Sequence, residues 1–265
     1  MRAMALKLSY LEYGSGPALI ILHGLFGSGR NWNTVAKALA TTHKVYTLDL
    51  RNHGSSPWAE AMSYYDLAED VHGFIEERRL APVAVLGHSM GGKTAMVLAL
   101  EHGHLVDRLI VVDIAPVVYG SDLEYYLKAM QDVTLTGLKR RDEVEAQLRG
   151  KIEDAGIRLF LMQNLVYRDE HFEWRINLPA LASNMGQLIS FPGAATTRVY
   201  NGKALFISGG LSNYVRPENH ELIYRMFPKA EFAVITGAGH WVHADQPERL
   251  VSRVKEFLRR AEPAS

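Results

Sequence analysis

The sequence predicts an α/β fold in which a mostly parallel sheet carries helices on both faces. Parallel strands are buried on both faces and are therefore nearly continuous apolar runs. Four such runs occupy residues 18–24, 44–50, 82–88 and 108–114. Segments with helical spacing separate them, at 31–41, 64–80 and 89–103. Because strand and helix alternate, and 48% of the 265 residues are apolar, the chain can build one large core around a parallel sheet.

Local signals support the individual elements. Residues 5–13 alternate in polarity with period two before a Gly-Ser-Gly-Pro turn, which indicates an edge hairpin at the start of the chain. Ser63 and Asp66 have the spacing of a capping box, so a helix is expected to begin at residue 64.

The alternation stops after Pro116, where about 85 residues of mostly helical, charged sequence follow. It resumes with strands at 203–210 and 230–239 and with helices that begin at Pro217 and near Pro247. We therefore expect residues 117–202 to form a helical cap, or lid, over a core made of residues 1–116 and 203–265.

Composition excludes several classes of function. There is no cysteine, so a thiolate nucleophile, a disulfide frame and a Cys-ligated zinc are ruled out. Lys plus Arg and Asp plus Glu both number 29, and no basic run is long enough to follow a phosphate backbone, so nucleic acid is not expected as a partner. Neither a signal peptide nor a membrane span is evident. We expect a cytoplasmic protein, a monomer or homodimer, that acts on a small molecule.

A nucleophile is predicted at Ser89, within the sequence GHSMGG at 87–92. The G-x-S-x-G pattern is weak alone, but here it directly follows an apolar strand and leads into an apolar helix, as a nucleophile elbow requires. Side chains at Gly87 or Gly91 would collide across so tight a turn. The alternative, that Ser89 only caps the helix, leaves these glycines unexplained.

The hydroxyl of a serine needs a general base, and His240 is the candidate. It follows the last strand late in the chain, where the order nucleophile, acid, histidine places the base. His243 is the rival, with a solvated or supporting role as the alternative. The remaining histidines considered are expected to pack or to lie at the surface: His88, His53, His102 and His104.

The acid is expected at Asp113. The strand after the cap segment ends in ISGGLSNYV and offers no carboxylate before Glu218. Asp113 stands at the carboxyl end of the preceding strand, on the same sheet edge as Ser89. Capping the turn toward Pro116 is its alternative role, and Glu218 and Asp245 are the reserves for the catalytic acid.

Backbone amides are expected to stabilise the anionic intermediate. The amide of Met90 follows the nucleophile, and that of Leu25 lies in the loop HGLFG after the first buried strand. An apolar acyl pocket is expected from five side chains: Phe26, His88, Trp241, Leu165 and Met185. The basic run Lys139, Arg140 and Arg141 is either a solvated helix face or a site for a CoA phosphate.

Together these segments resemble the α/β-hydrolase superfamily, and more narrowly its YbfF-type small esterases and acyl-thioesterases. The narrower resemblance rests on Asn52, where most relatives have glycine, on Lys93 and on the segment DIAP that begins at Asp113. It implies an eight-stranded, mostly parallel sheet, a helical cap, no cofactor or metal, and Asp113 as the third member of the triad.

The function expected is hydrolysis of short- to medium-chain carboxylic esters, and of acyl-CoA thioesters, through an acyl-Ser89 intermediate. Two other functions remain open. The same elbow occurs in cofactor-free haloperoxidases and perhydrolases, and a hydrolase fold can also serve as a non-catalytic ligand receptor.

Overall fold

A computed structural model describes residues 5–120 and 122–259. Its main sheet has seven strands in the order β1-β3-β2-β4-β5-β8-β9, and all neighbours are parallel except β1 and β3. The strands are β1 Tyr10–Tyr13, β2 Ala18–Leu22, β3 Lys44–Leu48, β4 Val83–His88, β5 Val106–Val112, β8 Lys203–Gly209 and β9 Ala230–Ile235. The predicted α/β class and parallel sheet are confirmed.

Two details of the prediction were wrong. The main sheet has seven strands among the described residues, not eight. The expected opening hairpin does not form either, since β1 pairs with β3 and not with β2. The turn between β1 and β2 has positive φ at Gly14 and Gly16. It leads the chain into the interior of the sheet, where β2 pairs with β3 and β4.

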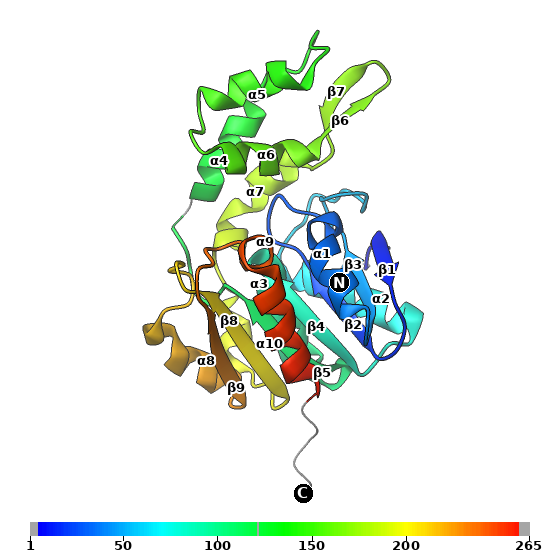
Figure 1. Ribbon diagram of the computed structural model, residues 1–265, viewed down its shortest axis with the longest axis vertical. Helices are drawn as coiled ribbons and strands as arrows, with labels where there is room; N and C mark the ends of the chain where they lie inside the picture. The colour runs from blue at the N-terminus through cyan, green and yellow to red at the C-terminus, as the bar shows by residue number, and fades with distance from the viewer. Residues whose placement is uncertain (1–4, 121, 260–265) are drawn as a thin grey trace, which may run out of the picture.

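Helices cover both faces of the sheet (Figure 1). The alternation along β2 shows how one strand serves two cores: Ile20 and Leu22 face one apolar cluster, and Leu19 and Ile21 face the other. The first cluster includes α2 Tyr64–Arg78, α3 Met90–Glu101 and α8 His220–Met226, and the second includes α1 Asn33–Leu39 and α10 Pro247–Arg259. As predicted, Ser63 caps α2, and its side chain accepts from the amide of Asp66.

Residues 122–189, which we call the cap, lie beyond the carboxyl ends of the strands (Figure 1). Its elements are α4 Asp122–Gln131, α5 Arg141–Arg149, α6 Ala155–Leu161, β6 Leu165–Arg168, β7 His171–Trp174 and α7 Leu178–Ile189. The β6-β7 hairpin was not predicted. Asp169 and Glu170 in its turn both have positive φ. Glycine and asparagine are more common at such positions, so no clear signal for this turn is present in the sequence.

Short elements complete the chain. They are the 3-10 helices η1 Gly29–Trp32, η2 Gly103–Leu105, η3 Met162–Asn164, η4 Gly193–Thr197 and η5 Pro217–Asn219, and the short helix α9 Val242–Asp245. Within the described residues, no helix is both long and apolar enough to cross a membrane.

A buried lysine of the core forms hydrogen bonds with the chain just before the cap and with the end of the last cap helix. Lys93, in the first turns of α3, donates through Nζ to the carbonyls of Val117, Ile189 and Ser190 at 2.9, 3.0 and 2.6 Å. Val117 lies where the chain leaves the core, and the other two lie at the end of α7. Burial lowers the pKa of Lys93 to about 7. The helix that begins beside Ser89 is thus bonded directly to the cap.

Candidate active site

Ser89 lies in a strained turn between β4 and α3, with φ of 52° and ψ of −118°. The turn is possible because its neighbours lack side chains. A Cβ on Gly87 would lie 2.1 Å from the carbonyl oxygen of Gly91, and one on Gly91 would lie 2.4 Å from that of Leu22. Both distances are far below van der Waals contact, so only glycine fits at these positions. This is the geometry of a nucleophile elbow.

His240 follows β9 and is held on two sides. Its Nδ1 donates to Oδ2 of Asp113 at 2.8 Å, and its backbone carbonyl accepts from Nε2 of His88 at 2.8 Å. The ring of Tyr214 stacks on the imidazole with centroids 4.0 Å apart. With Nδ1 engaged by a carboxylate, Nε2 is left to accept a proton.

Asp113 is fully buried just beyond β5, with φ of 52°. Besides His240, its carboxylate accepts from the backbone amide of Gly209 at 2.9 Å and from the hydroxyl of Ser212. These donors come from the end of β8, the strand that lacks a carboxylate of its own. The side chain of Asp113 thus reaches across to the neighbouring strand end and orients the imidazole.

The two reserve acids lie elsewhere. Glu218 is exposed at the start of η5. Asp245 accepts from the amide of Gly239 at 2.8 Å and so shapes the loop that carries His240. Neither is bonded to the imidazole.

Two further histidines near the site, His243 and His88, are buried. His243 is buried and stacks on Trp32 with centroids 4.4 Å apart, and burial lowers its pKa to about 3. Burial also lowers the pKa of His88 well below its usual value. His53 and His102, expected at the surface or in turns, are buried. The lowered pKa values keep the rings of His243 and His88 uncharged, because the protein interior does not stabilise an imidazolium as water does.

Ser89 and His240 line the same cavity. Among the described side chains, no hydrogen bond joins the Ser89 hydroxyl to the imidazole, although the Asp113 bond to the other ring nitrogen is in place. Catalytic hydrogen bonds of this kind are often long before substrate binds.

The loop at residues 23–27 lies close to Ser89: a Cβ on Gly24 would lie 3.2 Å from Cβ of Ser89. The backbone amide of Phe26 donates to Nε2 of His53 at 3.3 Å. The backbone carbonyl of Phe26 accepts from Nδ2 of Asn164, a cap residue, at 2.8 Å. Among the described residues, no hydrogen bond uses the amides of Leu25 or Met90, the latter at the start of α3. Both amides are therefore available to an oxyanion.

The cavity at Ser89 is small, about 40 Å³, and mainly apolar. Of the five expected pocket residues, Phe26, His88 and Trp241 line it. Leu165 and Met185 do not, because both are buried in the apolar core. The cap contributes side chains that were not singled out as pocket residues: Leu123, Tyr126, Ile157, Phe160 and Leu161.

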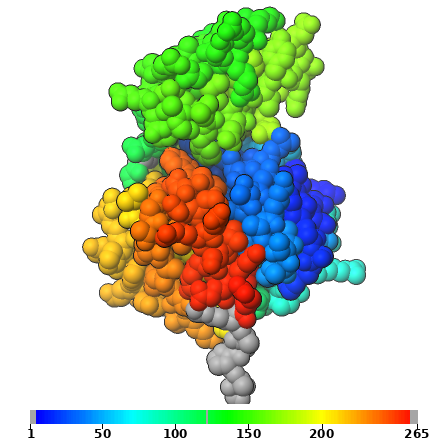
Figure 2. All heavy atoms as spheres, viewed as in Figure 1, coloured from blue at the N-terminus to red at the C-terminus, as the bar shows by residue number. Residues whose placement is uncertain are grey.

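A larger groove of about 660 Å³ adjoins this cavity. The two share five residues, Asn31, Ile157, Phe160, Trp241 and His243, and the rings of Phe160 and Trp241 lie 5.9 Å apart. Arg30, Asp154 and Asp245 add charge to the groove. In Figure 2 the cap, in green, lies directly above the orange and blue segments of the core that supply the other wall.

The basic run at 139–141 is engaged within the cap. Lys139 donates to the carbonyl of Glu170, Arg140 pairs with Asp142, and Arg141 donates to the carbonyls of Leu165 and Met162. None of these residues lines the cavity or the groove.

Comparison with known proteins places this geometry in a family. The family model of the α/β hydrolase fold matches residues 17–247. The chain belongs to the α/β hydrolase fold family. The predicted membership, which rested on the elbow and the segments around it, is confirmed.

Three proteins similar to this α/β hydrolase are named as a lipase or an esterase. It is 42% identical to the mouse sn-1-specific diacylglycerol lipase ABHD11 over 250 residues, covering 91% of this chain and 81% of the relative. It is 32% identical to Esterase YbfF of Escherichia coli, covering 93% and 94%. A solved marine microorganism esterase superposes with a TM-score of 0.92 at 38% identity, covering 96% of this chain and all of that one.

Sequence reasoning missed three supporting residues of this hydrolase. His53 and Asn164 hold the loop at 23–27, yet they lie 27 and 138 residues from Phe26 along the chain. Lys93 was noted only as a mark of the subgroup. A lysine inside an apolar helix was a signal that it has buried partners, because an unpaired charge there is costly.

Proposed function

We propose that this α/β hydrolase cleaves short- to medium-chain carboxylic esters through an acyl intermediate on Ser89. The observation that carries the proposal is the bond between His240 and the buried carboxylate of Asp113, beside the cavity that Ser89 lines. The names of the relatives support carboxylic ester hydrolysis as the class of reaction.

The proposed reaction has two halves. In the first, Nε2 of His240 takes the hydroxyl proton while Oγ of Ser89 attacks the ester carbonyl, and the imidazolium then protonates the departing alcohol. In the second, water loses a proton to His240 and attacks the carbonyl of the acyl-enzyme. The imidazolium then returns this proton to Oγ of Ser89 as the bond between Oγ and the acyl carbon breaks, which releases the carboxylic acid and restores the hydroxyl. Asp113 remains ionised and stabilises the imidazolium in both halves.

Each tetrahedral intermediate places a negative charge on the former carbonyl oxygen. We propose that the amides of Met90 and Leu25 donate to it, aided by the N-terminus of α3. The fixed loop at residues 23–27 matters here, because donors that are already oriented need no reorganisation during the reaction. Asn164 links that loop to the cap, so the cap position and the oxyanion site are coupled.

The cavity at Ser89 and the adjoining groove suggest where the two parts of an ester substrate bind. The small apolar cavity would hold one short part of the ester at the scissile bond, and the adjoining groove has room for a larger part. An acyl-CoA thioester would undergo the same chemistry, with its nucleotide outside the cavity.

The test is an acyl-chain series from acetyl to dodecanoyl, measured in parallel on p-nitrophenyl esters, diacylglycerols and CoA thioesters. The proposal expects the oxygen esters to be hydrolysed, with kcat/KM declining for the longest acyl chains. Ser89→Ala is the control and should abolish every hydrolytic signal. Failure of the wild type on all oxygen esters would overturn the proposal, and turnover of acetate with peroxide alone would indicate a perhydrolase instead.

A further inference from the structure

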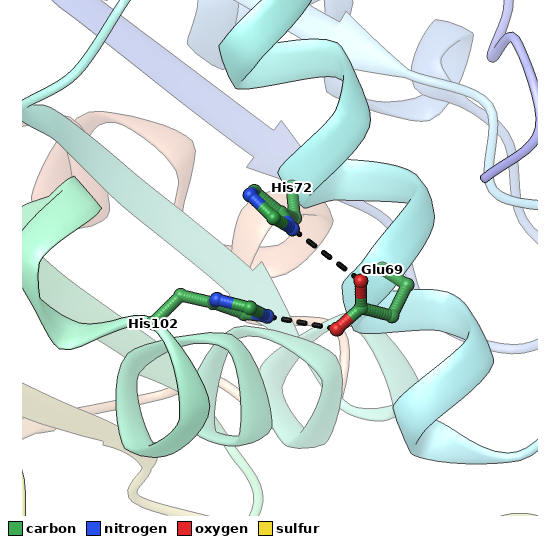
Figure 3. A group of neighbouring side chains, drawn as sticks. All are labelled: Glu69, His72 and His102. Carbon is green, nitrogen blue, oxygen red and sulfur yellow. Dashed lines mark hydrogen bonds and ion pairs between the residues drawn. The ribbon is translucent and has the colours of Figure 1, made fainter. Parts of the chain in front are cut away.

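A group of three side chains outside the active site carries a separate inference. Glu69 and His72 lie one turn apart on α2, and His102 ends α3, the helix packed beside it. Figure 3 shows the three side chains converging from the two helices, with Glu69 between the histidines' bonding nitrogens. His72 and His102 are 30 positions apart in the sequence, so a search for short ligand spacings would not find this arrangement.

The contacts are those of a shared carboxylate. Oε1 of Glu69 lies 2.8 Å from Nε2 of His102, and Oε2 lies 3.4 Å from Nδ1 of His72. The two imidazole rings stack with centroids 4.1 Å apart. A single divalent cation between the three groups could bind one nitrogen of each ring and one oxygen of the carboxylate at the same time.

We propose that Glu69, His72 and His102 form a zinc-binding site. One ligand atom from each lies within 4.8 Å of the others. In a tetrahedral site with bonds of about 2.0–2.1 Å, ligand atoms are about 3.4 Å apart, so small side-chain rotations close the gap. Two imidazole nitrogens and one carboxylate oxygen suit Zn²⁺, whereas Mg²⁺ and Ca²⁺ take oxygen ligands.

Exposure decides what fills the fourth position. The side chains of His72 and Glu69 are 26% and 25% exposed, whereas that of His102 is 9% exposed. The ion would be anchored on the buried side by His102 and would face solvent on the other, so water takes the remaining position.

The proposed site lies apart from the site of ester hydrolysis. His102 follows the C-terminus of α3, and Ser89 precedes its N-terminus, with 12 helical residues between them. At the rise of an α-helix these residues span about 18 Å. Zinc there would link α2 to α3 on one face of the sheet and would stabilise the folded chain by mass action. This inference does not depend on the proposed function.

The test is titration of the metal-free full-length protein with Zn²⁺, followed by calorimetry and by the thermal midpoint, Tm. The proposal expects one ion per chain and a higher Tm. His72→Gln and His102→Gln should each weaken binding at least tenfold, because glutamine keeps a hydrogen-bond donor for Glu69 but is a poor zinc ligand. His104→Gln is the matched control, since its ring lies 6.5 Å from that of His102 and is not part of the group.

A chain with eleven histidines can also bind zinc elsewhere, so the variants decide the result. Equal binding by the wild type, His72→Gln and His102→Gln would overturn the proposal, and so would no binding at 100 µM Zn²⁺. Circular dichroism of each variant establishes that it is folded. If a single variant fails to fold, Glu69→Gln takes its place in the comparison.

Discussion

The carboxylate of Asp113 and the imidazole of His240 meet at 2.8 Å although they lie 127 residues apart. Asp113 comes from the end of β5, while the amide and hydroxyl that also bind it, from Gly209 and Ser212, belong to the end of β8. The carboxylate of this site therefore comes from β5, while two of the donors that hold it come from the end of the neighbouring strand β8. This relationship leads to the first prediction.

Asp113→Asn should lower kcat for ester hydrolysis by about 10³–10⁴-fold, because an amide favours the wrong imidazole tautomer and cannot balance an imidazolium. Steady-state kinetics with a p-nitrophenyl ester measures the effect. Glu218→Gln is the matched control and should leave kcat unchanged. A normal rate in Asp113→Asn together with a loss in Glu218→Gln would transfer the role to Glu218.

The elbow glycines should tolerate no side chain. Gly91→Ala places a methyl group 2.4 Å from the carbonyl oxygen of Leu22, so we expect a destabilisation of at least about 3 kcal/mol or a failure to fold. Gly186→Ala, in α7 with open space around it, should instead be neutral or stabilise by up to about 1 kcal/mol. Urea unfolding compares the two. A fully stable Gly91→Ala would refute the proposed packing of the turn.

Lys93→Met should destabilise the protein by about 3 kcal/mol, because three buried carbonyls lose their donor while the apolar volume is nearly kept. It should also raise KM more than it lowers kcat if the cap is displaced. Lys37→Met, at an exposed position on α1, is the control and should change neither quantity. Unfolding in urea and ester kinetics on the same samples provide both readouts. Unchanged stability in Lys93→Met would mean that the cap is held by other contacts.

Acid should unfold this protein through its buried histidines. The pKa values of His53 and His243 in the fold are about 3, below the usual 6.5, so the unfolded chain binds protons there first. Their contribution to stability is present above pH 6.5 and is lost as the pH falls toward 3, by up to about 1.4 kcal/mol per pH unit and histidine.

The unfolding free energy measured between pH 7 and pH 4.5 checks this. His53→Asn should show a shallower pH dependence than the wild type, and His171→Asn, at an exposed site, should match the wild type. A pH-independent unfolding free energy over this range would contradict the assignment of both rings as buried and neutral.

Much of the fold was predictable because parallel strands and amphipathic helices leave continuous local patterns. The nucleophile elbow could be predicted in the same way, because Gly87 and Gly91 flank Ser89 and an apolar strand and an apolar helix adjoin them in the sequence. The missed features depend on contacts between distant residues. Asn164 reaches Phe26 from the cap, and Leu165 and Met185 face the core and not the cavity; no periodicity distinguishes those environments. The β6-β7 turn was hidden because Asp169 and Glu170 replace the residues that usually mark it.

The most direct test of the central claim is to treat the protein with a fluorophosphonate ester and to locate the adduct by peptide mass spectrometry. The account predicts one covalent adduct on Ser89, much slower labelling in His240→Ala, and none at that peptide in Ser89→Ala. Labelling of another residue, or ester turnover that persists in Ser89→Ala, would contradict it.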